Sequence, residues 1–267
     1  MVSSNITPEY FKQYRQLLGF NNQNGAKAFF GAKDVLPNVD MDYIDNLNNR
    51  LTEIILKLDS IVPKTIQLND EASFEDKYIY GAFEIIKSNN ILPKLNNQGR
   101  RPEEVYFSWM RGFVIANYFM KALSSIFDTD LNNIVVIGDD DLKKIDTFKR
   151  TPTADLELNF DTVGKIRLEI QSGFQGINDI KQHKVLEAKK VFEKTNTITL
   201  VIHFDIYNGQ VAIVRIDNIQ ETDANWITRQ QMEGQTVLNI DQNHFVWKMT
   251  GELPNSDDIK QIILGND

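Results

Sequence analysis

Residues 151–171 read Thr-Pro-Thr-Ala-Asp155-Leu-Glu157-Leu-Asn-Phe160-Asp-Thr-Val-Gly164-Lys-Ile-Arg-Leu-Glu169-Ile-Gln171. Apolar and polar residues alternate on both sides of Gly164, and successive side chains of a strand point to opposite faces. Each run therefore predicts a strand with one apolar face, which packs on a core, and one acidic face. Together the two runs predict an antiparallel hairpin.

The pairing register of this hairpin decides which acids meet. A slip by one residue would turn every side chain to the other face, so matching the apolar faces requires a loop with an odd number of residues. Gly164 as the third residue of a three-residue loop sets Glu157 opposite Glu169. The other register sets Asp155 directly opposite Glu169. In both registers three carboxylates gather within roughly 5–8 Å on one face.

Two interpretations of this acidic face remain open from geometry alone. Like charges at this distance repel, and a divalent cation would offset the repulsion. Mg²⁺ prefers one or two carboxylates together with waters and phosphate oxygens. The alternative is a solvated acidic face on which Arg167 pairs with Glu157.

The same stretch resembles the active-site hairpin of the PD-(D/E)XK nuclease superfamily, in particular that of type II restriction endonucleases. The family pattern places an Asp at the start of one strand and Asp/Glu-x-Lys on the next. Asp155 matches the first acid and Glu169 the second, whereas Gln171 takes the place of the lysine. Some restriction enzymes of the superfamily carry this Glu-x-Gln variant. The proline that usually precedes the Asp is displaced to Pro152.

The resemblance implies a site and a chemistry. Asp155, Glu169 and Gln171 would be the catalytic residues. Mg²⁺ would be the cofactor, held by Asp155, Glu169 and the carbonyl of Ile170. The uncharged Gln171 cannot act as a base, but its amide could orient a water or a phosphate oxygen. The resemblance covers roughly residues 104–216 and says little about the first hundred.

Basic residues around the hairpin are candidates for contacts with DNA: Arg100, Arg101, Lys149, Arg150, Lys181 and Lys184. The two adjacent arginines could clamp a phosphate or read a guanine edge. The lysines at 181 and 184 follow Gln171 and could supply the positive charge missing there. The plainer interpretation of each residue is a solvated surface cation.

The composition is that of a globular protein: 42% of the 267 residues are hydrophobic, there is no cysteine, and the net charge is −8. The absence of cysteine fits a reducing compartment. No apolar run is long enough to span a bilayer, and the first residues show no secretory signal, so we expect a cytoplasmic protein. The negative charge argues against indiscriminate nucleic-acid binding.

The pattern along the chain predicts an α+β protein with an α/β core. Residues 1–100 are expected to form a helical N-terminal subdomain, with helices at 8–18, 41–61 and 74–87. Residues 101–267 are expected to form the nuclease core around hairpin 151–171. There we predict a long helix at 102–127, a short buried strand at 132–138, a helix at 177–194 and a second hairpin at 197–216. Residues 226–232 are read as helix or loop. A strand at 244–249 and a closing helix from 257 follow. This corresponds to a mixed central sheet flanked by helices, as in restriction endonucleases.

The expected function is a Mg²⁺-dependent, sequence-specific endonuclease of double-stranded DNA, that is, a type II restriction enzyme. A palindromic target would imply a homodimer with twofold symmetry. One alternative is another nuclease on the same core, such as a junction-resolving or repair enzyme. Another is a non-enzymatic α+β binding protein.

Overall fold

The computed structural model describes residues 7–32, 35–95, 100–138, 153–220, 222, 225–229 and 234–264. Before residue 96 the described elements are helical: α1 (Pro8–Leu17), α2 (Gln23–Phe30), α3 (Met41–Asp59), α4 (Glu71–Glu75), one π-helical turn (Asp76–Tyr80) and α5 (Gly81–Ser88). Thr7 caps α1 by accepting a hydrogen bond from the N–H of Tyr10, as the Thr-Pro-Glu start of this helix leads one to expect.

The remaining elements form an α+β core. Its helices are α6 (Pro102–Tyr118), α7 (Met120–Ile126), α8 (Gln182–Thr195) and α9 (Ser256–Leu264). Its strands are β1 (Val135–Val136), β2 (Leu156–Phe160), β3 (Gly164–Gly173), β4 (Asp179–Lys181), β5 (Ile198–Asp205), β6 (Gln210–Arg215), β7 (Trp226–Arg229), β8 (Gln235–Asn239) and β9 (Phe245–Lys248). The predicted fold class, a mixed sheet flanked by helices with a helical N-terminal region, is confirmed.

Among the described residues, the main sheet has six strands in the order β1-β2-β3-β5-β6-β9, and β4-β8-β7 form a second, smaller sheet. All neighbours in the main sheet run antiparallel except β3 and β5, which are parallel. Helix α8 connects this parallel pair, as such crossovers require. Strand β3 therefore lies inside the sheet, between β2 and β5.

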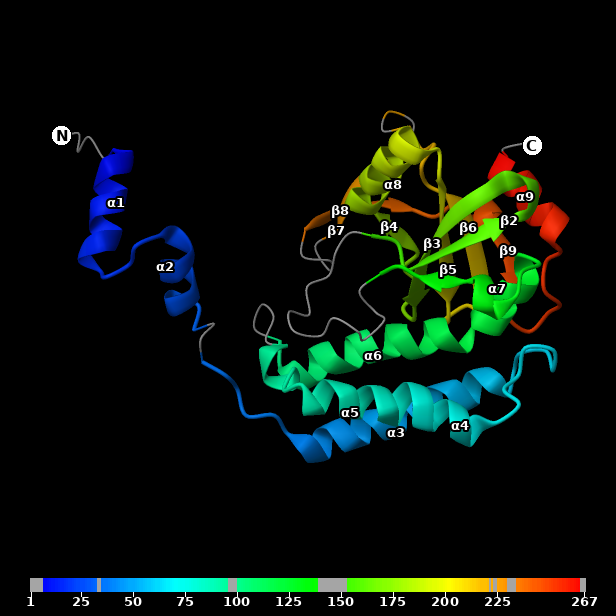
Figure 1. The fold of residues 1–267 in the computed structure, drawn as a ribbon, viewed down its shortest axis with the longest axis horizontal. Helices are drawn as coiled ribbons and strands as arrows, with labels where there is room; N and C mark the ends of the chain where they lie inside the picture. The colour runs from blue at the N-terminus through cyan, green and yellow to red at the C-terminus, as the bar shows by residue number, and fades with distance from the viewer. Residues whose placement is uncertain are drawn as a thin grey trace.

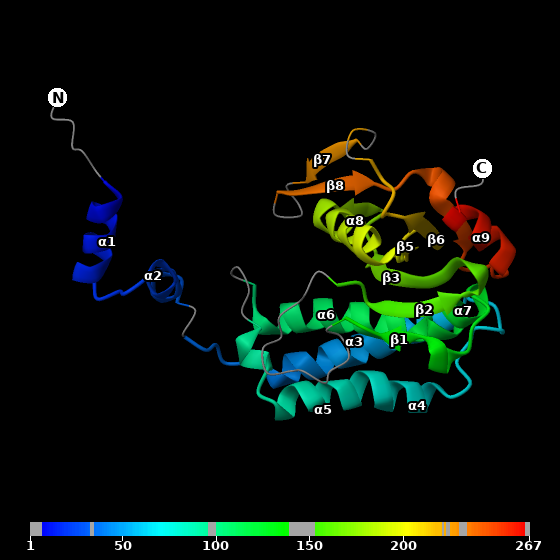
Figure 2. The same ribbon diagram turned by 45° about the horizontal axis from the view of Figure 1, so that its top comes forward.

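Two apolar clusters cover the two faces of the main sheet. The larger one joins α3, α5, α6, α7 and α9 to one face. The smaller one joins α8 and the small sheet to the other face. Figures 1 and 2 show this layering, with α6 beside the sheet, α3 and α5 beyond it, and α8 on the opposite side. None of the helices in the described ranges combines the length and apolar character needed to cross a bilayer.

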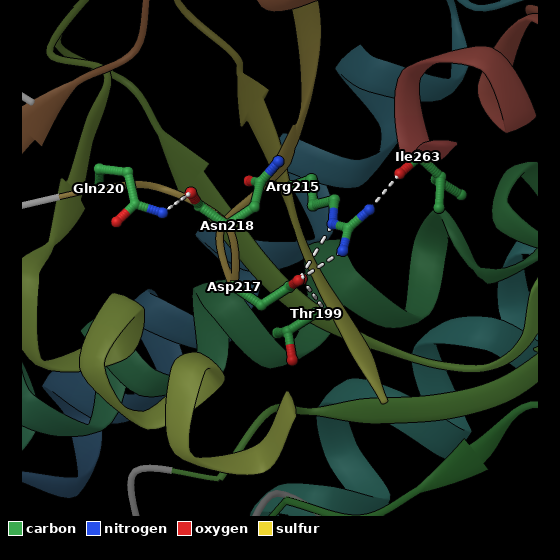
Figure 3. Close-up of polar contacts among 6 residues, drawn as sticks. All are labelled: Thr199, Arg215, Asp217, Asn218, Gln220 and Ile263. Carbon is green, nitrogen blue, oxygen red and sulfur yellow. Dashed lines mark hydrogen bonds and ion pairs between the residues drawn. The ribbon is translucent and has the colours of Figure 1, made fainter. Parts of the chain in front are cut away.

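A buried ion pair fastens the C-terminal helix to the sheet (Figure 3). The guanidinium of Arg215 donates to Oδ2 of Asp217 at 2.9 and 3.0 Å, and to the carbonyl of Ile263 in the last turn of α9 at 2.7 Å. The other carboxylate oxygen of Asp217 accepts the N–H of Thr199, from β5, at 2.9 Å. The carboxylate of Asp217 thus joins β5 to Arg215, and the guanidinium of Arg215 joins this pair to α9.

Several predicted elements are wrong in detail. The predicted long helix divides into α6 and α7 at Phe119, which is fully buried and stacks on Phe204 at 4.3 Å. The predicted buried strand reduces to β1, whose two valines are exposed because β1 is the edge of the sheet. Residues 179–181, expected to be helical, form β4. Residues 226–229, read as helix or loop, form β7.

Candidate functional site

The β2–β3 hairpin places Asp155 opposite Glu169. Leu156 pairs with Leu168 in the antiparallel ladder, and the N–H of Asp155 donates to the carbonyl of Leu168 at 3.0 Å. The loop comprises the three residues 161–163, and Gly164 opens β3 with φ +85°. Of the two predicted registers, the one that pairs Asp155 with Glu169 is therefore correct, and the one that pairs Glu157 with Glu169 is wrong.

Asp155 directly precedes β2, and its carboxylate lies beside the side of β3 that faces β2. Its Oδ2 accepts the N–H of Ile170 at 2.6 Å. In an extended strand the N–H and C=O of one residue point to the same edge. The carbonyl of Ile170 therefore points to the same edge as the Asp155 carboxylate. This is the arrangement expected of the two oxygen ligands predicted there.

Glu169 is buried against α8. Its side chain lies on the face of the sheet that α8 covers, it is 7% exposed, and its Oε2 is 2.8 Å from Nζ of Lys184. A pocket with a volume of about 10 Å³, room for one water, adjoins it. The pocket is lined by Ala154, Arg167, Glu169, Lys184, Glu187, Ala188, Val191, Thr199 and Ile216. The ammonium of Lys184 thus neutralises the buried carboxylate of Glu169.

Glu157 forms ion pairs with two cations instead of joining the other acids. Its carboxylate is 2.7 Å from Nζ of Lys165 and 3.2 Å from Nε of Arg167. Burial alone would raise the pKa of Glu157, but the hydrogen bonds from Lys165 and Arg167 outweigh it and lower this pKa. The pair with Arg167 is the one that the non-catalytic interpretation of the acidic face anticipates. The expected gathering of three carboxylates therefore reduces to Asp155 and Glu169.

Gln171 lies on the same face as Glu169 and pairs with His203 of β5, a residue that the sequence did not single out. His203 is buried, and its Nε2 donates to Oδ1 of Asn178 at 2.8 Å, because Nδ2 of Asn178 itself donates to Asp205. Nδ1 of His203 is left as a buried acceptor without a partner among the described residues. Burial lowers the pKa of His203, and the charges of Asp205 and Asp179 oppose this shift.

The predicted DNA-contacting cations differ in their surroundings. Lys184 contacts Glu169, and Lys181 ends β4 directly before α8. Arg100 is exposed and donates to the carbonyl of Glu104 at 3.2 Å. Arg101 lies 3.7 Å from Glu103 and over the ring of Tyr43. It lines an open groove with three carboxylates, Asp40, Asp42 and Glu104, which disfavour a phosphate there. Lys149 and Arg150 lie outside the described residues.

The donor set is compatible with one hard cation. Mg²⁺ takes oxygen ligands and keeps several waters, so two carboxylates and a carbonyl suffice. Asp155 and the Ile170 carbonyl share one edge of β3, and Glu169 is the neighbouring residue. Binding through Glu169 requires the Lys184 ammonium to move aside or to share the carboxylate. No group of three acids or histidines among the described residues forms a larger metal cage.

Comparison with known proteins adds no assignment to this geometry. No protein-family model matches the chain, and neither a curated protein nor a solved structure is significantly similar to it.

Proposed function

We propose that the protein is a Mg²⁺-dependent endonuclease of double-stranded DNA, of the type II restriction class. The observation that supports this most strongly is the direct opposition of Asp155 and Glu169 on neighbouring strands, with the carbonyl of Ile170 at the same edge as Asp155. Asp155 directly before β2, and Glu169 and the Ile170 carbonyl within β3, correspond to the acids and the carbonyl of the motif that the sequence resembles.

Each side chain has a separate task in this proposal. Asp155, Glu169 and the Ile170 carbonyl would hold the cation. Bound there, the ion would polarise the scissile phosphate and activate the attacking water. Gln171 would orient that water or a phosphate oxygen through its amide. Double-stranded DNA would be the partner, and a palindromic target would require a homodimer.

Lys184 takes the part that the lysine of Glu-x-Lys plays in the related pattern. It is anchored on α8 rather than on β3, yet its ammonium reaches the carboxylate of Glu169 at 2.8 Å. A divalent ion held by Glu169 would compete with the ammonium for this carboxylate, and Lys184 could then face a phosphate oxygen. Because Gln171 is neutral, the proposal assigns the cationic role of the motif to Lys184.

A second candidate function is that of a binding protein without hydrolytic activity. The burial of Glu169 and its ion pair with Lys184 favour it, because together they satisfy this carboxylate without any metal. In that case the hairpin is a structural element whose charges are neutralised internally.

Incubation with long unmethylated DNA, with Mg²⁺ and with EDTA, tests the proposal. We expect Mg²⁺-dependent cutting into discrete bands. Cutting that depends on branched or damaged substrate would assign the same site to a junction-resolving or repair nuclease. If every DNA substrate stays intact at all Mg²⁺ concentrations, the nuclease proposal fails and the binding function is favoured.

A further inference from the structure

Arg111 on α6 is held between two aromatic rings. Its guanidinium lies 5.6 Å from the ring centre of Phe107, one turn earlier on the helix, and 4.1 Å from that of Phe174, which follows β3. The arginine is half-buried, whereas Phe174 is exposed. The two ring contacts place the guanidinium at the end of the strand that carries Glu169 and Gln171.

This guanidinium has no carboxylate partner within the described part of the chain. The structure gives it no hydrogen bond and no ion pair there, only the two rings. On the same helix, the carboxylate of Glu103 pairs with Arg101 and accepts a hydrogen bond from the N–H of Asp40. Burial lowers the pKa of Arg111, and the charge of Arg100 lowers it further.

A half-buried guanidinium without a counter-charge is a candidate anion site. Burying such a cation without an opposite charge is unfavourable, and an anion bound to it offsets this cost. Guanidinium forks match the oxygens of a phosphate, and a guanidinium stacked on aromatic rings loses little freedom when it binds one.

We propose that Arg111 binds a backbone phosphate of a nucleic acid. Phe174 follows Glu169 by five positions, which corresponds to roughly 16 Å of extended chain. A duplex lying along this end of β3 would therefore bring to Arg111 a phosphate on the order of five nucleotides from the one at Glu169. The identity of the polyanion rests on the proposed nuclease function, whereas the anion site rests on the side chains alone.

The binding test uses a fluorescein-labelled mixed-sequence duplex of about 20 base pairs, in EDTA, titrated with the full-length protein at several salt concentrations. For Arg111→Gln we expect an affinity loss of about tenfold and a slope of log K against log salt reduced by about one. Arg50→Gln is the matched control, since Arg50 is exposed and paired with Glu53 on α3. Arg111→Lys should keep the slope but recover only part of the affinity.

A stability measurement tests the premise separately. Because Arg111 has ring contacts but no counter-charge, and methionine can keep an apolar contact with those rings, Arg111→Met should change the melting temperature by only a few degrees; a much larger fall would show that the guanidinium is structurally paired with an anionic group. Equal affinity and equal salt slope for Arg111→Gln and Arg50→Gln would overturn the phosphate site. Since EDTA prevents cleavage, failure of the nuclease proposal would appear only as intact DNA in Mg²⁺ and not in this binding assay.

Discussion

Lys184 is the residue at which the two interpretations of the hairpin diverge. Its ammonium neutralises a carboxylate that is almost fully buried, and in the proposed nuclease it would also supply a cation to the phosphate. A structural ion pair and a catalytic charge make different demands on the same side chain. The first needs only Glu169, whereas the second needs a phosphate as well.

For Lys184→Gln we expect a loss of DNA cleavage of about 100-fold, the usual effect of removing one group that stabilises developing charge. Gln171→Lys in the same chain should restore at least part of it, because residues 169 and 171 lie on one face of β3. Cleavage rates and thermal unfolding are measured on the single and double variants. Wild-type cutting by a folded Lys184→Gln variant would assign the pair a structural role.

His203 makes the stability of the fold depend on pH near neutrality. Burial lowers its pKa below the usual 6.5, so the unfolded chain binds this proton more readily than the folded one. Stability is therefore fully present above about pH 6.5 and falls as the pH drops below it, by up to about 1.4 kcal/mol per pH unit. His203→Gln should reduce the loss between pH 7.5 and 5.5 in urea unfolding.

The control for this measurement is His183→Gln, since the pKa of His183 is also lowered, by burial and by the charges of Lys181 and Lys184. His183 is exposed, so its share should be the smaller of the two. An unchanged pH dependence in His203→Gln would mean that His203 gains no proton on unfolding in this range.

At the scale of elements, helix α9 packs on the core through Ile259 and Ile263 and is also held by one guanidinium. Arg215 contacts the last turn of this helix, and Asp217 beneath it is buried (Figure 3). Arg215→Met removes both contacts and leaves an unpaired buried carboxylate, which typically costs about 3–5 kcal/mol. We expect a loss of stability of this size and faster hydrogen exchange in α9.

The control for α9 is Lys260→Met, which removes ion pairs to Asp161 and Asp257. These partners are exposed, so the expected cost is below about 1 kcal/mol. Equal effects of the two substitutions would contradict the anchoring role of Arg215.

The sequence predicts elements whose pattern is local and long. The repeat of α3, the alternation in β2 and β3, and the Asn208-Gly209 turn between β5 and β6 each carry their own signal, and these elements form as expected. Strands β4 and β7 do not, because each is only three or four residues long and shows no clear periodicity. In addition, β4 pairs with β8, which follows it by more than fifty residues, whereas β7 pairs with β8 as its neighbour in the chain.

The candidate site follows the same division. Asp155 and Glu169 can be predicted because they alternate with apolar residues on two adjacent strands. The pairing register depends on the turn, where Asp161 also adopts a positive φ. The contact of Lys184 with Glu169, and the places of His203 and Arg111, arise where α8, β5 and α6 pack against β3. The sequence suggests Lys184 as a cation near Gln171, but the partners of these three residues depend on tertiary packing and do not follow from sequence spacing.

At the scale of the whole molecule, α1 and α2 lie apart from the rest of the chain in both views (Figures 1 and 2). Within the described residues, α1 buries no side chain and α2 buries only Ala26, while Phe29, Phe30 and Leu17 are exposed. Helices this short are marginal by themselves in water. They contribute almost nothing to the core of the same chain.

Deletion of residues 1–36 should therefore leave the melting temperature of the remaining protein within about 2 °C of the full chain, because no core contact is lost. Thermal unfolding at two protein concentrations measures this, with sedimentation of both forms as a control for association. A large fall in melting temperature would show that the two helices pack on the body or on a second copy.

The proposed function requires Asp155 and Glu169 to act together on a phosphodiester. The most direct measurement is Mg²⁺-dependent cleavage of unmethylated DNA by Asp155→Asn, Glu169→Gln and Glu187→Gln, the last a neighbouring acid that lines the pocket beside Glu169. We predict a loss of at least about 100-fold for the first two and near wild-type cutting for the third. Undiminished cutting by Asp155→Asn or Glu169→Gln would contradict the central claim.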